Sequence, residues 1–369
     1  MTVRYCDGTG AGNNAYDGLA AVWDGTHGPK ASLNGAEDSP VAAGDLVHVR
    51  SGTYREKLTV DVSGTAGNAI EYRGDYQGLI WPGGGVVRIT GSDDDLVATR
   101  ANGIVGSAKS YRTFRGLFFD TCTGYSVSPT NATSYWVINQ CMSTHSAGLW
   151  LCNHSGDNHI TIGDCVVYAH QGYFGLASQQ LADNGSSIIE NCLIVGGQNG
   201  IYWRQGGTTI RNCTVLFANV RGMYIATNGT GAGQTVTVNN CVIANAPTGL
   251  VAGSLGMMIE DYNNVYGCST ARSNVAVGAN SLAYPPLFDA RWFFELVAGG
   301  KLLSPFDLAS YSKLVNVAGT SPTTTDMRGT AVIGAERELG ALEYDPTLSI
   351  EAGSGGAVSI SPMRGGLIG

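Results

Sequence analysis

Short apolar segments recur along the middle of the chain, and each one leads into the same polar and cysteine positions. Five segments combine a branched apolar residue, two further residues and a cysteine, and the cysteines stand 24, 27, 21 and 28 residues apart. These segments are Ile138-Asn139-Gln140-Cys141, Ile162-Gly163-Asp164-Cys165, Ile189-Glu190-Asn191-Cys192, Ile210-Arg211-Asn212-Cys213 and Val238-Asn239-Asn240-Cys241. Leu117 takes the cysteine position one unit upstream and Val265 one unit downstream, which gives roughly 25 residues per unit.

Each unit also carries a glycine seven to nine residues after the cysteine position, and a short alternating apolar run follows most of these glycines. Alternation with a period of two, without a helical stretch, is typical of strands. A unit of about 25 residues is too short for a βαβ crossover, which needs about 30 residues. The pattern therefore predicts an all-β fold, a single-stranded right-handed parallel β-helix (a solenoid) with N- and C-terminal caps.

The interior of such a solenoid consists of ladders, because equivalent residues of successive coils lie about 4.8 Å apart. Cysteine is a small buried hydrophobe that packs into a ladder without a partner. We therefore expect an interior stack of free thiols at Cys141, Cys165, Cys192, Cys213 and Cys241. The repeated asparagines before them (Asn191, Asn212 and Asn240) are expected to form an amide ladder at a bend.

Two apolar columns alternate with the interior positions, so they should face away from the core. The first is aromatic and comprises Trp150, Phe174, Tyr202 and Tyr224; the second comprises Phe118, Met142, Val166, Leu193, Val242 and Tyr266. Apolar stripes of this length need a cover. The aromatic column fits a sugar platform or a subunit interface, whereas the second column favours an interface between copies of the chain. If the inside/outside phase is shifted by one residue, both columns are core instead.

The chain divides by pattern into four parts: an N-terminal cap at 1–45, the parallel β-helix at 46–282, a C-terminal capping region at 283–345, and a Gly/Ser-rich tail at 346–369. The tail contains two apolar segments, Leu348-Ser349-Ile350 and Ala357-Val358-Ser359-Ile360. We expect these to add as strands to a neighbouring subunit or partner.

The composition and net charge exclude several fold classes and several kinds of partner. Of 369 residues, 53 are glycine and only 14% are charged, which excludes a helical bundle, and the apolar fraction of 43% excludes disorder. The net charge is −8 with no run of Lys or Arg, so neither nucleic acid nor a membrane surface is an expected partner. No apolar stretch could span a membrane, and Met1-Thr2-Val3-Arg4 lacks the apolar core of a signal peptide. Either export does not use that route or the sequence was trimmed.

Candidate chemistry is sparse. The acidic residues of the regular coils occupy different places in the repeat, so no catalytic site is predicted; they are Asp120, Asp157, Asp164, Asp183, Glu190, Glu260 and Asp261. Glu190 and Arg211 hold the same place in adjacent units and are expected to form an ion pair. The run Asp93-Asp94-Asp95 is either a solvated loop or a Ca²⁺ site, and His145 and His170 lack a third metal ligand. We expect no cofactor and no metal, with Ca²⁺ as the alternative.

The coil signatures resemble those of the right-handed parallel β-helix proteins of the pectate-lyase-like superfamily. The segments Gly44 to Glu56 and Leu339-Gly340-Ala341-Leu342-Glu343-Tyr344 resemble the entry and the close of such chains, and the likeness covers most of residues 40–345. The superfamily includes lyases, hydrolases, epimerases, tailspikes and non-catalytic virion proteins, so the resemblance implies a fold and not one activity. The polygalacturonase and pectate lyase motifs have no counterpart in this sequence.

The whole chain looks most like the versions carried by tailed bacteriophages. This resemblance implies a virion structural protein (a capsid decoration, fibre or tailspike-like component) that forms a homotrimer on the particle. Its expected partners are itself, other virion proteins through the tail, and a host surface glycan. The alternatives are a polysaccharide lyase or glycoside hydrolase that acts on an acidic or capsular polysaccharide, and a non-catalytic glycan-binding module.

Overall fold

The computed structural model describes most of the coil region and short pieces of the C-terminal region. The described residues are 1–38, 41–131, 133–146, 149–150, 159–169, 172–178, 186–204, 206–226, 235–286, 295–297, 301–303, 313–314, 317–319, 325–326 and 338–341.

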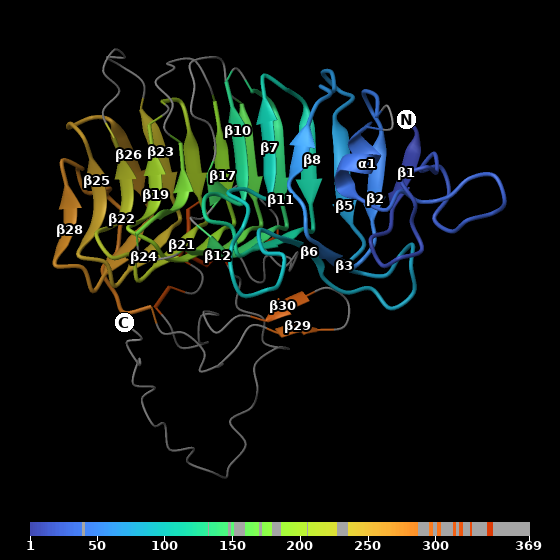
Figure 1. The fold of residues 1–369 in the computed structure, drawn as a ribbon. Helices are drawn as coiled ribbons and strands as arrows, with labels where there is room; N and C mark the ends of the chain where they lie inside the picture. Colours follow the sequence, from blue (N-terminus) through green and yellow to red (C-terminus); the bar gives the residue numbers. More distant parts are fainter. Residues whose placement is uncertain are drawn as a thin grey trace, which may run out of the picture.

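Parallel sheets form the sides of an elongated coil (Figure 1). Sheet A contains, in spatial order, β1 (Val3–Cys6), β2 (Leu46–Val49), β5 (Ile70–Gly74), β8 (Arg112–Arg115), β11 (Trp136–Asn139), β14 (Ile160–Gly163), β17 (Ile188–Glu190), β20 (Thr209–Arg211), β23 (Val236–Asn239) and β26 (Met258–Asp261). Sheet B contains β3 (Gly52–Tyr54), β6 (Val87–Thr90), β9 (Phe118–Asp120), β12 (Met142–Ser146), β15 (Val166–Ala169), β18 (Leu193–Gly196), β21 (Thr214–Leu216), β24 (Val242–Ala244) and β27 (Asn264–Tyr266).

Two further parallel sheets supply strands from successive coils. Sheet C contains β4 (Leu58–Val60), β7 (Ile104–Ser107) and β10 (Val127–Thr130), and sheet D contains β13 (Leu149–Trp150), β16 (Phe174–Ala177), β19 (Asn199–Trp203), β22 (Arg221–Ile225), β25 (Thr248–Ala252) and β28 (Thr270–Ser273). The short helix α1 (Leu33–Asp38) packs its apolar residues into the interior of the coil, and β29 (Glu295–Val297) and β30 (Lys301–Leu303) form a separate antiparallel pair. The fold is a right-handed parallel β-helix, as the sequence predicts. The coil begins earlier than predicted, because β1 lies within the predicted cap at 1–45 and already pairs with β2 in sheet A.

One residue turns the chain from sheet A to sheet B in each regular coil. Its φ is positive, between 52° and 55° at Gln140, Asp164, Asn191, Asn212 and Asn240. Residues other than glycine rarely adopt this left-handed backbone conformation, and Asn and Asp tolerate it better than most. The backbone of the bend therefore explains the repeated asparagine, and the following residue points into the core.

The five thiols lie inside the coil and are at most 2% exposed. Each Sγ donates to the carbonyl two residues earlier, at 3.1–3.3 Å, and contacts a carbonyl of the preceding coil at 3.6–4.0 Å. These cysteines are free. Main-chain carbonyls thus satisfy the thiols, and the ladder needs no disulfide.

The last coil departs from the predicted repeat. Val242 pairs with Asn264, so the buried Asn263, and not Val265, takes the cysteine position. Tyr266 consequently pairs with Ala244 and lies two residues beyond the column in which the sequence analysis placed it.

Buried ion pairs occupy interior positions near both ends of the coil. Near the N-terminal end, Glu37 of α1 binds Arg112 through two contacts of 2.7 and 3.0 Å and accepts a hydrogen bond from Tyr72 at 2.7 Å. At the other end, Glu260 accepts a hydrogen bond from Arg272 Nε at 2.8 Å. Arg112 is in register with Ile70 and Trp136, and Glu260 is in register with Val238. A charged residue therefore stands at each of these two positions where the neighbouring coils carry an apolar residue.

Removing one partner of the N-terminal pair should be costly. We expect Glu37→Gln to lower the free energy of unfolding by about 3 kcal/mol in urea denaturation, because Arg112 stays charged in a dry interior. The double variant Glu37→Gln/Arg112→Met should recover much of this loss. A single variant within about 0.5 kcal/mol of the parent would contradict this role for the pair.

Candidate functional site

The second predicted apolar column faces outward on sheet B and is covered by the chain itself. Val166 and Leu193 belong to one buried cluster with Ala341, and Val242 belongs to another with Leu314, Ala318 and Leu339. We call the described residues 313–314, 317–319, 325–326 and 338–341 the C-terminal strap. Along these coils the predicted outward phase is right, and the strap covers part of the column within this chain. The interface with a second copy of the chain stays a prediction. Met142 and Phe118 are half-buried, and Tyr266 is exposed.

The aromatic column lies on the outer side of sheet D, where Phe174, Tyr202 and Tyr224 are half-buried; the side chain of Trp150 lies outside the described residues. Phe174 is out of register, since its Cα pairs with Asn199, yet its ring stacks on Tyr202 at 4.7 Å. Tyr202 contacts Tyr224 at 5.5 Å, and the Arg221 guanidinium lies 4.4 Å from the Tyr224 ring centre. Each ring therefore meets a neighbour, and both uses of the column, a sugar platform or a subunit interface, stay predictions.

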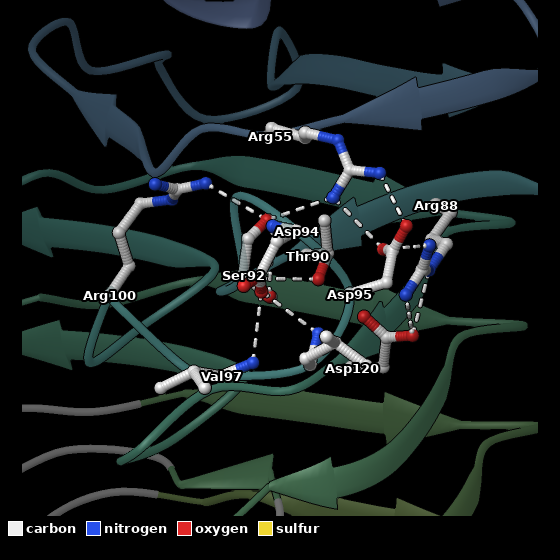
Figure 2. Close-up of polar contacts among 10 residues, drawn as sticks. Arg55, Arg88, Thr90, Ser92, Asp94, Asp95, Val97, Arg100 and Asp120 are labelled. Atoms are coloured by element: carbon white, nitrogen blue, oxygen red, sulfur yellow. Dashed lines mark hydrogen bonds and ion pairs between the residues drawn. The ribbon is translucent and has the colours of Figure 1, made fainter.

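Arginines hold the acidic run at residues 93–95 (Figure 2). Asp95 binds Arg55 and Arg88, with shortest contacts of 2.5 and 2.6 Å. Asp93 binds Arg100 at 2.6 Å. Asp94 accepts the backbone N–H groups of Leu96 and Val97. The hydrogen bond from Arg55 is the main cause that lowers the pKa of Asp95 to about 2.

These contacts hold the loop in place, and Ca²⁺ binding there stays a prediction. Among the described residues, no three His, Cys, Asp or Glu side chains are grouped to hold a metal ion. The side chains of His145 and His170 lie outside the described residues.

A different polar group forms at the corner between sheets A and B. The last outward position of successive sheet A strands is occupied in register by Arg73, Arg115, Asn139, Gly163, Glu190 and Arg211. Asp164 follows Gly163 at the bend. We call Tyr76, Arg115, Asn139, Asp164 and Glu190 the corner site.

Asp164 is held by amides of the coils on either side. Asn139 Nδ2 donates to Oδ2 at 2.9 Å, and Asn191 Nδ2 donates to Oδ1 at 3.0 Å. Gly163 permits the first contact, because a Cβ at that position would lie 2.9 Å from Asn139 Nδ2. The missing side chain therefore lets the Asn139 amide cross to the carboxyl group.

The pKa of Asp164 is raised to about 6. Burial is the main cause; the hydrogen bonds from Asn191 and Asn139 oppose it, and Cys165 and Glu190 add to it electrostatically. A carboxyl group with this pKa exchanges a proton near neutral pH.

Tyr76 brings a phenol to the same corner from the loop after β5. Its ring lies over Gly116, where a Cβ would approach ring carbons to 2.7 Å, and its hydroxyl donates to Gln140 Oε1 at 3.3 Å. Burial raises the pKa of Tyr76, the positive charges of Arg115 and Arg73 oppose this, and Asp164 adds to it. The phenol, the guanidinium groups and the carboxyl group therefore act on one another.

Sequence reasoning identified the members of this site only in part. The expected ion pair between Glu190 and Arg211 is confirmed, with Nη2 2.6 Å from Oε2. Asp164 and Glu190 were both candidates but were not expected to share a face. Gly163, next to Asp164, pairs with Glu190, and the charge of Glu190 raises the pKa of Asp164. Tyr76 and Arg115 were missed. The available signal was the acid itself, because Asp164 stands where the other units carry Gln or Asn.

Comparison with known proteins identifies the fold. No family model and no curated protein matches the chain. Among solved structures, it is similar to pectate lyase Pel9A, with 15% identity, coverage of 94% of this chain and 97% of that one, and a TM-score of 0.54. XylC in complex with xylose matches with 11% identity over 77% of this chain and 70% of the other, at a TM-score of 0.54.

A rhamnogalacturonan lyase matches with 13% identity over 84% of this chain and 95% of the other, at a TM-score of 0.50. At these identities the likeness establishes the fold alone, which is the parallel β-helix. In the part of the chain that is described, no helix is long and apolar enough to cross a membrane.

Asp164 at the bend should lower the free energy of unfolding at neutral pH. Because the pKa of Asp164 is raised from 3.8 to about 6, the folded state binds more protons than the unfolded state in this window. Stability should therefore fall as pH rises from about 4 to about 6. We expect Asp164→Asn to remove this slope and to stabilise the protein at pH 7 by at most about 3 kcal/mol.

Asn212→Asp is the matched control. It places an acid at a buried bend two coils further along, where burial of the charged carboxylate should destabilise the protein at neutral pH. Both variants are compared by urea denaturation across this pH range. An Asp164→Asn protein that keeps the parent's pH slope would contradict the assignment.

Proposed function

We propose that this protein cleaves glycosidic bonds of a polysaccharide at the corner site. The observation that carries the proposal is Asp164, an acid with a raised pKa of about 6 in a column that otherwise favours amides. Residues that break a local structural rule at a cost in stability are expected at functional sites. Asp164 is therefore assigned as the proton donor to the leaving oxygen.

Glu190 supplies the second carboxyl group that glycoside hydrolysis requires. It lies on the adjacent coil, where Arg211 pairs with it, while Asp164 is held by neutral amides. Two acids in such different surroundings fit a division into proton donor and base or nucleophile.

Arginine at the corner favours an acidic polymer. Arg73 already pairs with Glu71 at 2.7 Å, whereas Arg115 forms no ion pair with a described residue. A guanidinium group binds a sugar carboxylate well. The similar solved structures add support, because two are named as lyases of pectate and rhamnogalacturonan and one contains xylose.

The virion role, the homotrimer and the docking of the tail stay predictions. The tail at 346–369 lies outside the described residues. A place on a phage particle and cleavage of a host glycan are compatible with each other.

The proposal is tested with a panel of acidic and neutral polysaccharides, by assay of new reducing ends. Asp164→Asn and Glu190→Gln should each lower the rate by about 100-fold or more, whereas Asp61→Asn, the same type of substitution at an exposed position outside the corner site, should leave it unchanged. The rate should fall as pH rises above about 6, because the donor must be protonated. Unsaturated products that absorb ultraviolet light would show that the reaction is an elimination and not a hydrolysis. Activity that survives both substitutions would overturn the assignment of the corner site.

A further inference from the structure

The C-terminal strap docks on the bend column as well as on the apolar column. Asn240 Nδ2 donates to the Gly319 carbonyl at 3.1 Å, and its Oδ1 accepts the Gly319 N–H at 2.8 Å. The N–H of Gly340 donates to the Asn240 carbonyl at 2.8 Å, and that of Ala341 to Thr214 Oγ1 at 3.0 Å. Polar and apolar contacts therefore fix the strap along one corner of the coil.

The strap contacts the corner site through the Asn191 amide. Asn191 is buried, and its Nδ2 donates to Thr325 of the strap at 3.2 Å and to Asp164 Oδ1 at 3.0 Å. The contact with Thr325 joins residues 134 positions apart in the sequence. An amide nitrogen has two hydrogens, so each acceptor takes one of them.

We propose that the strap is a positioning element of the corner site: by engaging one hydrogen of the Asn191 amide, it holds the other on Asp164. An amide fixed at both hydrogens loses less freedom when the carboxyl group ionises. Strap docking and ionisation of Asp164 are then coupled, and the coupling acts in both directions. A ligand or partner that lifts the strap would change the proton affinity of Asp164.

Other charges also face Asp164 and must be separated from this effect. Glu190 lies on the next coil, Tyr76 and the arginines near it lie on the side of the preceding coils, and Cys165 follows in the chain. The strap itself carries the buried Asp326 next to Thr325. Release of the strap could act through this charge or through entry of water, so the test has to isolate the amide.

Leu339→Asp releases the strap without touching the corner, because Leu339 packs on Val242 three coils away. Asn191→Gly removes the amide and keeps a residue that tolerates the positive φ of 53°. The readout is the titration of Asp164 by ¹³C NMR of its carboxyl carbon, identified by its loss in Asp164→Asn. Hydrogen exchange of the strap verifies its release.

We expect Leu339→Asp to raise the pKa of Asp164 by about half a unit to one unit in the parent, and to have no further effect in the Asn191→Gly background. Asn191→Gly alone should raise this pKa at least as much. Asn240→Gly is the matched control, since it removes an equivalent amide that binds the strap but not Asp164, and its shift should not exceed that of Leu339→Asp.

An unchanged or lowered pKa in a strap-released parent would overturn the proposal. A shift that persists in the Asn191→Gly background would also overturn it, because the strap would then act by charge or by water. The titration needs no substrate, so it stands even if no polysaccharide is cleaved. If Asp164 is the proton donor of the proposed function, the alkaline limb of the pH–rate profile should move with the titration.

Discussion

In-register stacking of flat coils is the constraint on which the rest of this structure depends. Each coil places equivalent residues directly beside those of the next at about 4.8 Å, so every position becomes a column whose members share one environment. At the corner between sheets A and B the column also shares a left-handed backbone. Thiols fill the interior column, and amides or a glycine dominate the bend, because these groups meet the shared requirements.

Departures from a column are therefore informative. Arg112 and Glu260 replace apolar residues of their sheet A columns, and each is paired with a partner of opposite charge. Asp164 departs from the amide column, and its partners are neutral amides. Gly163 beside it removes a side chain, and Asn139 uses the space to reach the carboxyl group. The corner site is thus a local exception built into a regular scaffold.

Sequence periodicity predicts the parts of the structure that repeat. The coil length, the strands and the outward phase of Val166 and Leu193 follow from the spacing of residues within each unit, so they can be predicted from that unit alone. The strap could not be predicted in this way, because Thr325 meets Asn191 across 134 residues and its contact is set by tertiary packing. Tyr76 was missed for the same reason, since it meets Gln140 from a loop 64 residues upstream. Asn263 was misplaced because a buried amide was not expected where the other coils carry cysteine.

The most direct test of this account is the titration of the Asp164 carboxyl carbon in the intact chain. The account predicts a midpoint near 6, because burial outweighs the two amide hydrogen bonds. A midpoint at or below that of an ordinary aspartic acid, about 3.9, would show that the bend stabilises the charged form. Asp164 would then be ionised near neutral pH and could not act as a proton donor.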